Sequence, residues 1–285
     1  MVKFGAHLYL WAEKLDVPSL KYVRKIKELG FDGFEIPLTE LDSIDIEKTK
    51  KELKRQGVVG IGSLGLPKDM DIVSSDEATR RRGIEFMKRC VNAISELGGD
   101  SINGVVYASW GKITGKPRTQ EEWNRSVESL KEVCRYAKDY GVTFGLEPVN
   151  RFETYFLNTA ADALKLAKDI GEPNVKVHLD TFHMNIEEKD FYHPIKEVGP
   201  MLGHMHCCES DRGMAGTGHV DWDGVFRALS EVKYDKWIVF ESFTMDMEKI
   251  AASTAIWRKM APSADALATG GLKFLKQMAQ KYLTK

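Results

Sequence analysis

The sequence predicts a (β/α)₈ barrel from two observations: a repeated unit and the number of its copies. Each copy has a helical segment, one or two charged residues, a glycine and a short apolar strand. The clearest copies are IKELGFDGFEIPL (26–38), ISELGGDSINGVVY (94–107), AKDYGVTFGLEPV (137–149) and AKDIGEPNVKVHLD (167–180). Glycine after a helix fits a left-handed C-cap, and the apolar run after it fits a buried parallel strand. Eight strands separated by helical patterns then indicate a parallel barrel.

The elements follow one another in strict alternation. The expected strands are 3–10, the end of 26–38, 58–65, the end of 94–107, 142–148, 175–180, 202–206 and 237–242. Helical patterns cover 17–30, 45–56, 76–98, 119–140, 159–170, 187–198, 221–232 and a last region through 285. An open doubly wound sheet is the alternative, but no G-x-G-x-x-G follows the first strand. No Pro/Gly/Ser-rich linker divides the chain, so we expect residues 1–285 to form one catalytic domain.

Composition narrows the class of protein. Of the 285 residues 43% are hydrophobic and 29% charged, with a formal net charge of −1, as in ordinary globular proteins. A nucleic-acid or anionic-membrane partner would favour a basic stripe, so we expect neither. Four cysteines are too sparse for a disulfide framework. The N-terminus does not resemble a secretory signal, and no stretch is long enough to span a membrane. We therefore expect a cytoplasmic protein with reduced thiols.

Ionisable side chains close four consecutive strands, where a barrel places its active face. Strands five to eight end in Glu147, Asp180, His206 and Glu241. Three carboxylates at one level would repel each other, and a divalent cation removes that repulsion. One nitrogen and three oxygens suit Mn²⁺, Co²⁺ or Mg²⁺ better than a structural zinc. Any one of these residues alone is more often a helix cap or a loop charge, but four aligned ones favour a metal site.

Other polar residues lie near these strand ends. Side chains two positions apart on a strand share a face, so His178 and His204 are expected one layer deeper than the ligands, as buried supports. His183 lies beyond its strand, where it could reach a substrate. Glu35, in FEIPL of strand two, is either a support for the ligands or a satisfied buried charge.

Four motifs carry a resemblance to a known family. They are GLEPVNRFET (145–154), HLDTFHMN (178–185), GHMHCCESDRG (203–213) and VFESF (239–243). Over nearly its whole length the chain resembles the ketose 3-epimerases, which belong to the sugar-phosphate isomerase/epimerase-like barrels. The resemblance implies that the four strand-end residues hold a divalent metal, foremost Mn²⁺, with Co²⁺ and Mg²⁺ as alternatives. It also implies a small ketose as the partner, and a homodimer or homotetramer.

The resemblance also implies substrate contacts. In the family, some positions hold O1 to O3 of the sugar, others form apolar walls around it, and a backbone segment lies near it. At each of these positions this chain has a residue of the kind that the family uses. They are Glu153, His183 and Arg212 for the oxygens, Trp110 and Phe243 for the walls, and Gly65 with Leu66 for the backbone segment. The sequence departs from the family near strand one, where His7 replaces an aromatic and Leu15 replaces a tryptophan. We place His7 among the substrate contacts, and the preferred ketose is not implied.

The activity implied by the resemblance is epimerisation of free ketoses at C3 through an enediolate. One of Glu147 and Glu241 would remove the C3 proton, and the other would deliver a proton from the opposite face. An aldose–ketose isomerase or a polyol dehydratase is the alternative on the same barrel. A phosphodiesterase for damaged DNA would need more histidines and a basic surface. A non-catalytic sugar- or metal-binding protein is a further alternative, and the glycine-rich segment 210–222 raises the question of phosphorylated substrates.

Overall fold

The expected strands form a closed, all-parallel barrel in the computed structural model, which describes residues 1–284. Each strand pairs with its neighbours in chain order, and the last strand pairs with the first to close the ring. The strands are β1 (Lys3–His7), β2 (Gly33–Pro37), β3 (Val59–Ser63), β4 (Ser101–Gly104), β5 (Thr143–Leu146), β6 (Val175–Asp180), β7 (Leu202–His206) and β8 (Trp237–Phe240). The predicted single (β/α)₈ barrel is confirmed, and closure excludes the open doubly wound sheet.

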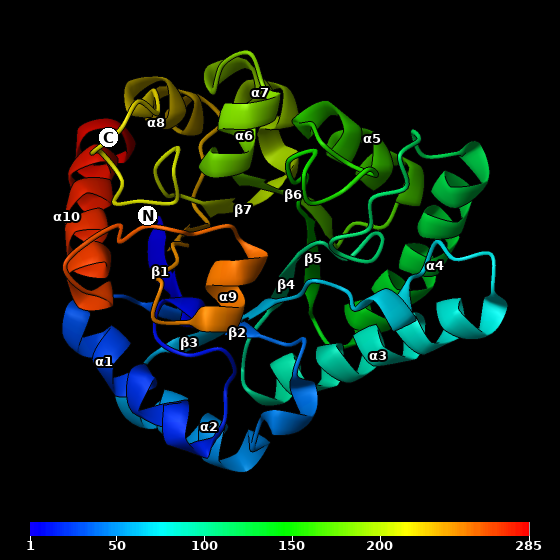
Figure 1. The fold of residues 1–285 in the computed structure, drawn as a ribbon, viewed down its shortest axis with the longest axis horizontal. Helices are drawn as coiled ribbons and strands as arrows, with labels where there is room; N and C mark the ends of the chain where they lie inside the picture. Colours follow the sequence, from blue (N-terminus) through cyan, green and yellow to red (C-terminus); the bar gives the residue numbers. More distant parts are fainter. Residues whose placement is uncertain (285) are drawn as a thin grey trace.

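Helices surround the barrel (Figure 1). They are α1 (Lys21–Leu29), α2 (Ile46–Gln56), α3 (Glu77–Glu96), α4 (Gln120–Asp139), α5 (Ala160–Ile170), α6 (Thr181–Glu187), α7 (Tyr192–Val198), α8 (Trp222–Glu231), α9 (Glu248–Ser253) and α10 (Ala264–Leu283). Short 3₁₀ turns are η1 (Leu8–Leu10), η2 (Val17–Leu20), η3 (Leu41–Ser43), η4 (Lys68–Met70) and η5 (Gly199–Met201). Because α10 contacts both α1 and α8, it completes the outer ring. In the described residues, no helix is long and apolar enough to cross a membrane.

Local sequence signals explain where helices begin and end. Thr119 caps α4 by accepting the Glu122 N–H, and the Glu122 carboxylate accepts the Thr119 N–H in return. Gly30 and Gly171 follow α1 and α5 with φ of 92° and 70°. Only glycine adopts this left-handed conformation without steric cost, so the predicted helix–glycine–strand unit is confirmed at both places.

Some predicted bounds were wrong. Strand one stops at His7 rather than at residue 10, because the chain turns into η1 and the His7 Nδ1 accepts the N–H of Tyr9. The helix expected over 187–198 is shorter, since α7 covers only its second half, and α6, which ends at Glu187, was not anticipated. The last region holds α9 as well as α10, and α9 was not anticipated.

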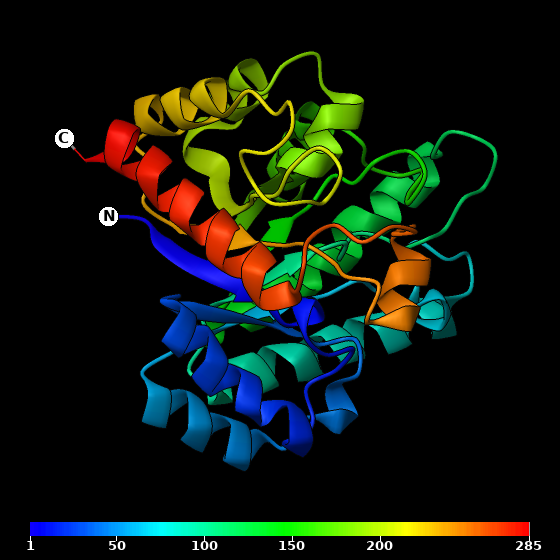
Figure 2. The same ribbon diagram turned by 60° about the vertical axis from the view of Figure 1, so that its left-hand side comes forward.

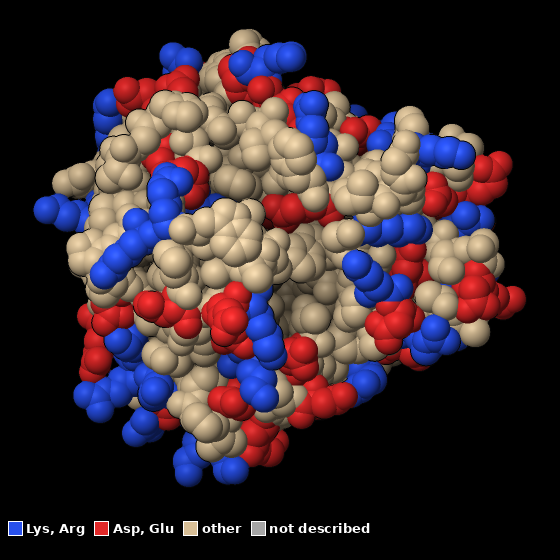
Figure 3. All heavy atoms as spheres, in the orientation of Figure 1, with Lys and Arg blue, Asp and Glu red and all other residues tan. Residues whose placement is uncertain are grey.

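The two ends of the barrel differ. Ile61, Trp237 and Val239 pack together inside the barrel as a small apolar cluster. The strands run toward the other end, as Figure 2 shows for β1, which leads from the N-terminus toward the side where α9 lies. Figure 3 looks onto that end and shows a hollow beside α9, with positive and negative side chains interspersed around it. The C-terminal ends of the strands therefore open beneath α9.

Candidate active site

The four predicted ligands come together at the C-terminal ends of β5 to β8. Asp180 and His206 are the last residues of β6 and β7 and are register partners, so they stand at the same level. Glu147 and Glu241 each follow directly after the end of β5 and of β8. One donor atom from each of the four lies within 4.8 Å of the others.

The His206 ring is the centre of this group. Its Nδ1 lies 3.3 Å from Glu241 Oε2, 3.7 Å from Glu147 Oε1 and 3.9 Å from Asp180 Oδ2. This nitrogen is buried and has no hydrogen-bond partner in the described part of the chain. Buried polar atoms are rarely left unpaired, and one that faces three carboxylates fits a cation ligand. The donor set therefore fits a divalent metal ion.

Burial and crowding shape the electrostatics. Burial raises the pKa of Glu147 well above its ordinary value, and the carboxylates of Glu241 and Asp180 raise it further. Burial acts in the same direction on Glu241, but His206 and Arg212 outweigh it and hold the pKa of Glu241 well below its ordinary value. Against the effect of burial, neighbouring carboxylates raise the pKa of His206 well above its usual range. The site thus attracts positive charge.

Arg212 supplies part of that charge. Its guanidinium donates to Asp180, and to Glu241 Oε2 at 2.7 Å. It lies between two aromatic rings, 4.3 Å from the Phe182 centroid and 5.0 Å from that of Phe243. The Arg212 backbone has a φ of 64°, which is uncommon outside glycine. Such strain is often found at functional sites, where the surrounding contacts hold it.

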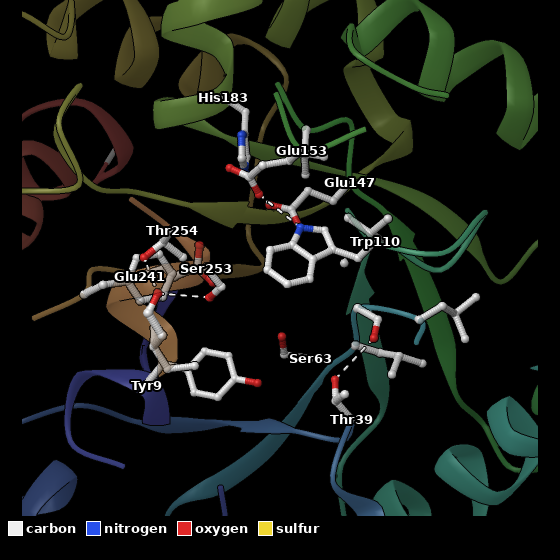
Figure 4. A pocket seen from close by; sticks show the side chains of 18 of the residues that line it. Tyr9, Thr39, Ser63, Trp110, Glu147, Glu153, His183, Glu241, Ser253 and Thr254 are labelled. Atoms are coloured by element: carbon white, nitrogen blue, oxygen red, sulfur yellow. Dashed lines mark hydrogen bonds and ion pairs between the residues drawn. The ribbon is translucent and has the colours of Figure 1, made fainter. Parts of the chain in front are cut away.

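A cavity of about 310 Å³ opens above the four predicted ligands. Glu147 and Glu241 line it and are 7% and 9% exposed, whereas Asp180 and His206 are 1% and 2% exposed and lie below the lining. Figure 4 shows Glu147, Glu153 and His183 on one side of the cavity and Thr39 and Ser63 on the other. Only the two glutamates of the ligand set can therefore touch a molecule in the cavity.

Glu153 and His183 are held by their neighbours. Glu153 accepts the Trp110 Nε1–H at 3.1 Å and the Asn150 Nδ2–H at 2.8 Å, one on each oxygen. The Asn150 backbone N–H donates to His183 Nδ1 at 3.1 Å. Burial and the nearby Arg212 lower the pKa of His183 well below its usual value, so the ring is neutral and has one nitrogen that can accept a hydrogen bond. Its Nε2 lies 3.0 Å from Arg212 Nη2, which can only donate, so Arg212 and the Asn150 N–H compete for that single acceptor.

The remaining predicted contacts also line the cavity, except for one. Trp110, Phe243, Gly65 and Leu66 are on its wall. Gly65 lies against Trp110, since a methyl group added there would come within 3.4 Å of the Trp110 Cβ. His7 is fully buried and is not on the wall.

The placement of His7 is a correction to the sequence analysis. Because the chain turns after β1, the Tyr9 ring lies 4.4 Å from the His7 ring and lines the cavity in its place. We therefore replace His7 with Tyr9 among the proposed substrate contacts.

Two buried histidines and Glu35 form a layer beneath the ligands. His178 and His204 are register partners one layer below Asp180 and His206, as period-two geometry predicts. The Glu35 carboxylate lies 2.7 Å from His206 Nε2 and 3.0 Å from His204 Nε2. Glu35 thus contacts a predicted ligand on the side away from the cavity.

Sequence reasoning missed several residues of this site. Tyr9, Thr39 and Ser63 line the cavity from the segments after β1 and β2 and from the end of β3. Ile250, Ser253 and Thr254 line it from α9 and the residue after it. Asn150 lies within GLEPVNRFET, so that motif could have identified it. For the α9 residues no motif gave a signal.

Comparison with known proteins places this chain in a family. The family model described as a xylose isomerase-like TIM barrel matches residues 23–278. A ketose 3-epimerase of Arthrobacter globiformis is 36% identical over 278 residues, which cover 96% of each chain. An L-ribulose 3-epimerase of Mesorhizobium japonicum is 37% identical over 278 residues, 96% of this chain and 93% of the relative.

Solved structures agree with these relatives. The crystal structure of D-allulose 3-epimerase from Methylomonas sp. in complex with D-allulose has a TM-score of 0.94 and 34% identity to this chain, and the match covers 97% of both. The D-psicose 3-epimerase structure determined in the presence of D-fructose has a TM-score of 0.91 and 30% identity, with 99% of both chains covered. The chain therefore belongs to the xylose isomerase-like TIM barrels and, among them, to the ketose 3-epimerases.

Proposed function

We propose that this protein epimerises free ketoses at C3 through an enediolate, with Glu147 and Glu241 as the two proton-transferring groups. One observation carries the proposal: of the four predicted ligands, only these two glutamates line the cavity. They come from β5 and β8, so they approach the cavity from different parts of the ring. One carboxylate would remove the C3 proton, and the other would return a proton on the opposite face.

The donor set supports a divalent metal, and we propose Mn²⁺ first, with Co²⁺ and Mg²⁺ as alternatives. Glu147, Asp180, His206 and Glu241 would hold it. Such an ion, when bound, would supply Lewis-acid stabilisation of negative charge on the oxygens of the ketose. Asp180 and His206, below the lining, would serve as ligands only.

The other residues of the wall would orient the sugar. His183 offers a ring nitrogen, Arg212 offers its guanidinium, and Glu153 accepts hydrogen bonds from hydroxyl groups. These three groups would hold the oxygens next to the reacting carbon. Fixed dipoles and charges of this kind need no rearrangement when charge develops on the substrate. The hydroxyls of Tyr9 and Ser63, on other parts of the wall, would receive the far end of the sugar.

An aldose–ketose isomerase remains the alternative on the same barrel. An isomerase transfers a proton between neighbouring carbons and can work from one face, whereas inversion at C3 needs a group on each face. Two glutamates on the cavity wall favour epimerisation. Free sugars are favoured over phosphates because Arg212 is already engaged by Asp180 and Glu241.

A substrate panel tests the proposal. Ketopentoses, ketohexoses and their phosphates would each be incubated with the Mn²⁺-loaded protein, and the products resolved by chromatography. We expect C3 epimers of free ketoses. Formation of aldoses without any C3 epimer would support the isomerase instead, and sugar binding without turnover would indicate a binding protein.

We also propose a homodimer or homotetramer in the cytoplasm. Phe152 and Trp257 are 75% and 70% exposed, which is unusual for large apolar side chains and supports a contact between subunits. All four cysteines are buried and unpaired, as expected in a reducing compartment. Light scattering on the purified protein would give the oligomeric state, and a monomer at micromolar concentration would contradict this part of the proposal.

A further inference from the structure

Glu35 is a fully buried carboxylate to which the proposed proton transfers assign no role. It is in β2, on the far side of the barrel from β6, and its register partners are His7 on β1 and Ile61 on β3. Its side chain is 0% exposed. Burying a carboxylate is costly unless it is paired, so its partners indicate why it is there.

Both oxygens of Glu35 face imidazole nitrogens from β7. Oε2 lies 2.7 Å from Nε2 of His206, and Oε1 lies 3.0 Å from Nε2 of His204. An ionised carboxylate can only accept hydrogen bonds. The Nε2 atom of His206, which forms the hydrogen bond, must therefore carry hydrogen.

This fixes the other nitrogen of His206. When Nε2 holds the hydrogen of a neutral imidazole, the lone pair is on Nδ1, the atom that faces Glu147, Asp180 and Glu241. In the opposite tautomer Nδ1 would donate to Glu241, 3.3 Å away, and could not bind a metal. The ring itself is packed against His178, with centroids 4.1 Å apart and planes at 80°.

We propose that Glu35 is a positioning residue for the metal site: it holds the hydrogen of His206 on Nε2 and so presents Nδ1 as the ligand. His204 lies beside the second oxygen of Glu35, with its Nε2 3.0 Å from Oε1. A carboxylate that accepts from the distal nitrogen of a ligand histidine orients the ring and increases its basicity. The inference rests on the metal site of the proposed function and is independent of which sugar is turned over.

Metal affinity tests this without any assay of turnover. Mn²⁺ binding to the metal-free protein would be measured by isothermal titration calorimetry for the wild type, Glu35→Gln and Glu35→Asp. Glu35→Gln keeps the shape and loses the charge, and we expect Mn²⁺ to bind about 10- to 100-fold more weakly. Glu35→Asp keeps the charge but is shorter by one methylene, so it cannot reach His206 at 2.7 Å. A positioning role predicts a comparable loss in both variants.

The matched control is Asp71→Asn. Asp71 is also a buried carboxylate, and it accepts the Ser109 N–H at 3.1 Å and the Lys112 ammonium at 2.8 Å, away from the four ligands. We expect this variant to bind Mn²⁺ as the wild type does. Circular dichroism would show that each variant is folded. A folded Glu35→Asp variant with wild-type affinity would overturn the proposal, because the charge alone would then suffice.

Nuclear magnetic resonance of the wild type gives a test that needs no variant. The protein would carry ¹⁵N-labelled histidine. The signals of His206 are those of the imidazole ring in which a nitrogen chemical shift changes when Mg²⁺ is added. We expect the Mg²⁺-loaded protein to show that response at Nδ1, together with a hydrogen on Nε2. Coordination through Nε2 would overturn the role of Glu35. A wild-type protein that binds neither ion would instead overturn the metal site of the proposed function, and this inference with it.

Discussion

Glu147→Gln separates the proposed chemistry from the fold. The Glu147 carboxylate accepts no hydrogen bond within the described residues, and the nitrogens of His178, His183 and His206 are 3.6 Å or more away from it. Burial and two carboxylates already raise the pKa of this acid. A neutral amide of the same shape removes that repulsion. We therefore expect the free energy of unfolding to stay the same or to rise by up to about 1 kcal/mol.

Turnover should change far more than stability. Positioned acid–base groups contribute roughly 10²- to 10⁴-fold to a rate. At 1.36 kcal/mol per tenfold change, this corresponds to about 2.7 to 5.5 kcal/mol of activation free energy. Epimerisation by Glu147→Gln at saturating Mn²⁺ should fall by that factor. Glu188→Gln keeps an oxygen that can accept the Ala160 N–H at the start of α5 and loses only a charge, so it is the matched control and should keep full activity.

Hydrogen exchange in D₂O then tests the two-sided mechanism. In Glu147→Gln, Glu241 can still remove the C3 hydrogen from the epimer that presents it to that face. Each glutamate variant should therefore exchange the C3 hydrogen of one epimer only, and the two variants should act on opposite epimers. Mass spectrometry of each recovered ketose measures this. If Glu147→Gln exchanges both epimers at equal rates, a single group serves both faces and the reasoning is refuted.

Three further outcomes follow from the structure. Trp110→Phe removes the hydrogen bond to Glu153 and should lower kcat/KM by about tenfold at unchanged stability, measured by steady-state kinetics; unchanged kinetics would show that Glu153 needs no such support. Gly83→Ala should destabilise the protein by about 1–3 kcal/mol in urea unfolding, because the added Cβ would lie 2.1 Å from the Met70 carbonyl oxygen. Alanine by itself favours helices, so a gain in stability would contradict this steric argument. Chelation should lower the midpoint of thermal unfolding and abolish turnover, and Mn²⁺ restored to 100 times its Kd should add about 2.7 kcal/mol; an unaffected midpoint would argue against a metal site.

The convergence of the four proposed ligands was predictable because each one closes an apolar strand. Glu147, Asp180, His206 and Glu241 come directly at or after the ends of four consecutive strands. A closed parallel barrel brings such ends to one level whatever the intervening helices do. Period-two geometry likewise predicted that His178 and His204 lie in the layer below.

The cavity wall was less predictable because it depends on turns rather than on strand period. A continuous strand over residues 3–10 would place His7 and Tyr9 on the same face, one layer apart. The turn at η1 instead lays the Tyr9 ring over His7. The α9 segment packs as a small separate cluster with Phe243 and Tyr9, and no sequence pattern indicates that it covers the strand ends.

The position of deuterium in the product tests the central claim most directly. The Mn²⁺-loaded protein would be incubated with D-fructose in D₂O, and the products would be separated and examined by NMR and mass spectrometry. Proton removal and return at C3 predict the C3 epimer of D-fructose carrying one deuterium at C3. An aldose labelled at C2, with no C3 epimer and no label at C3 of the ketose, would contradict the account.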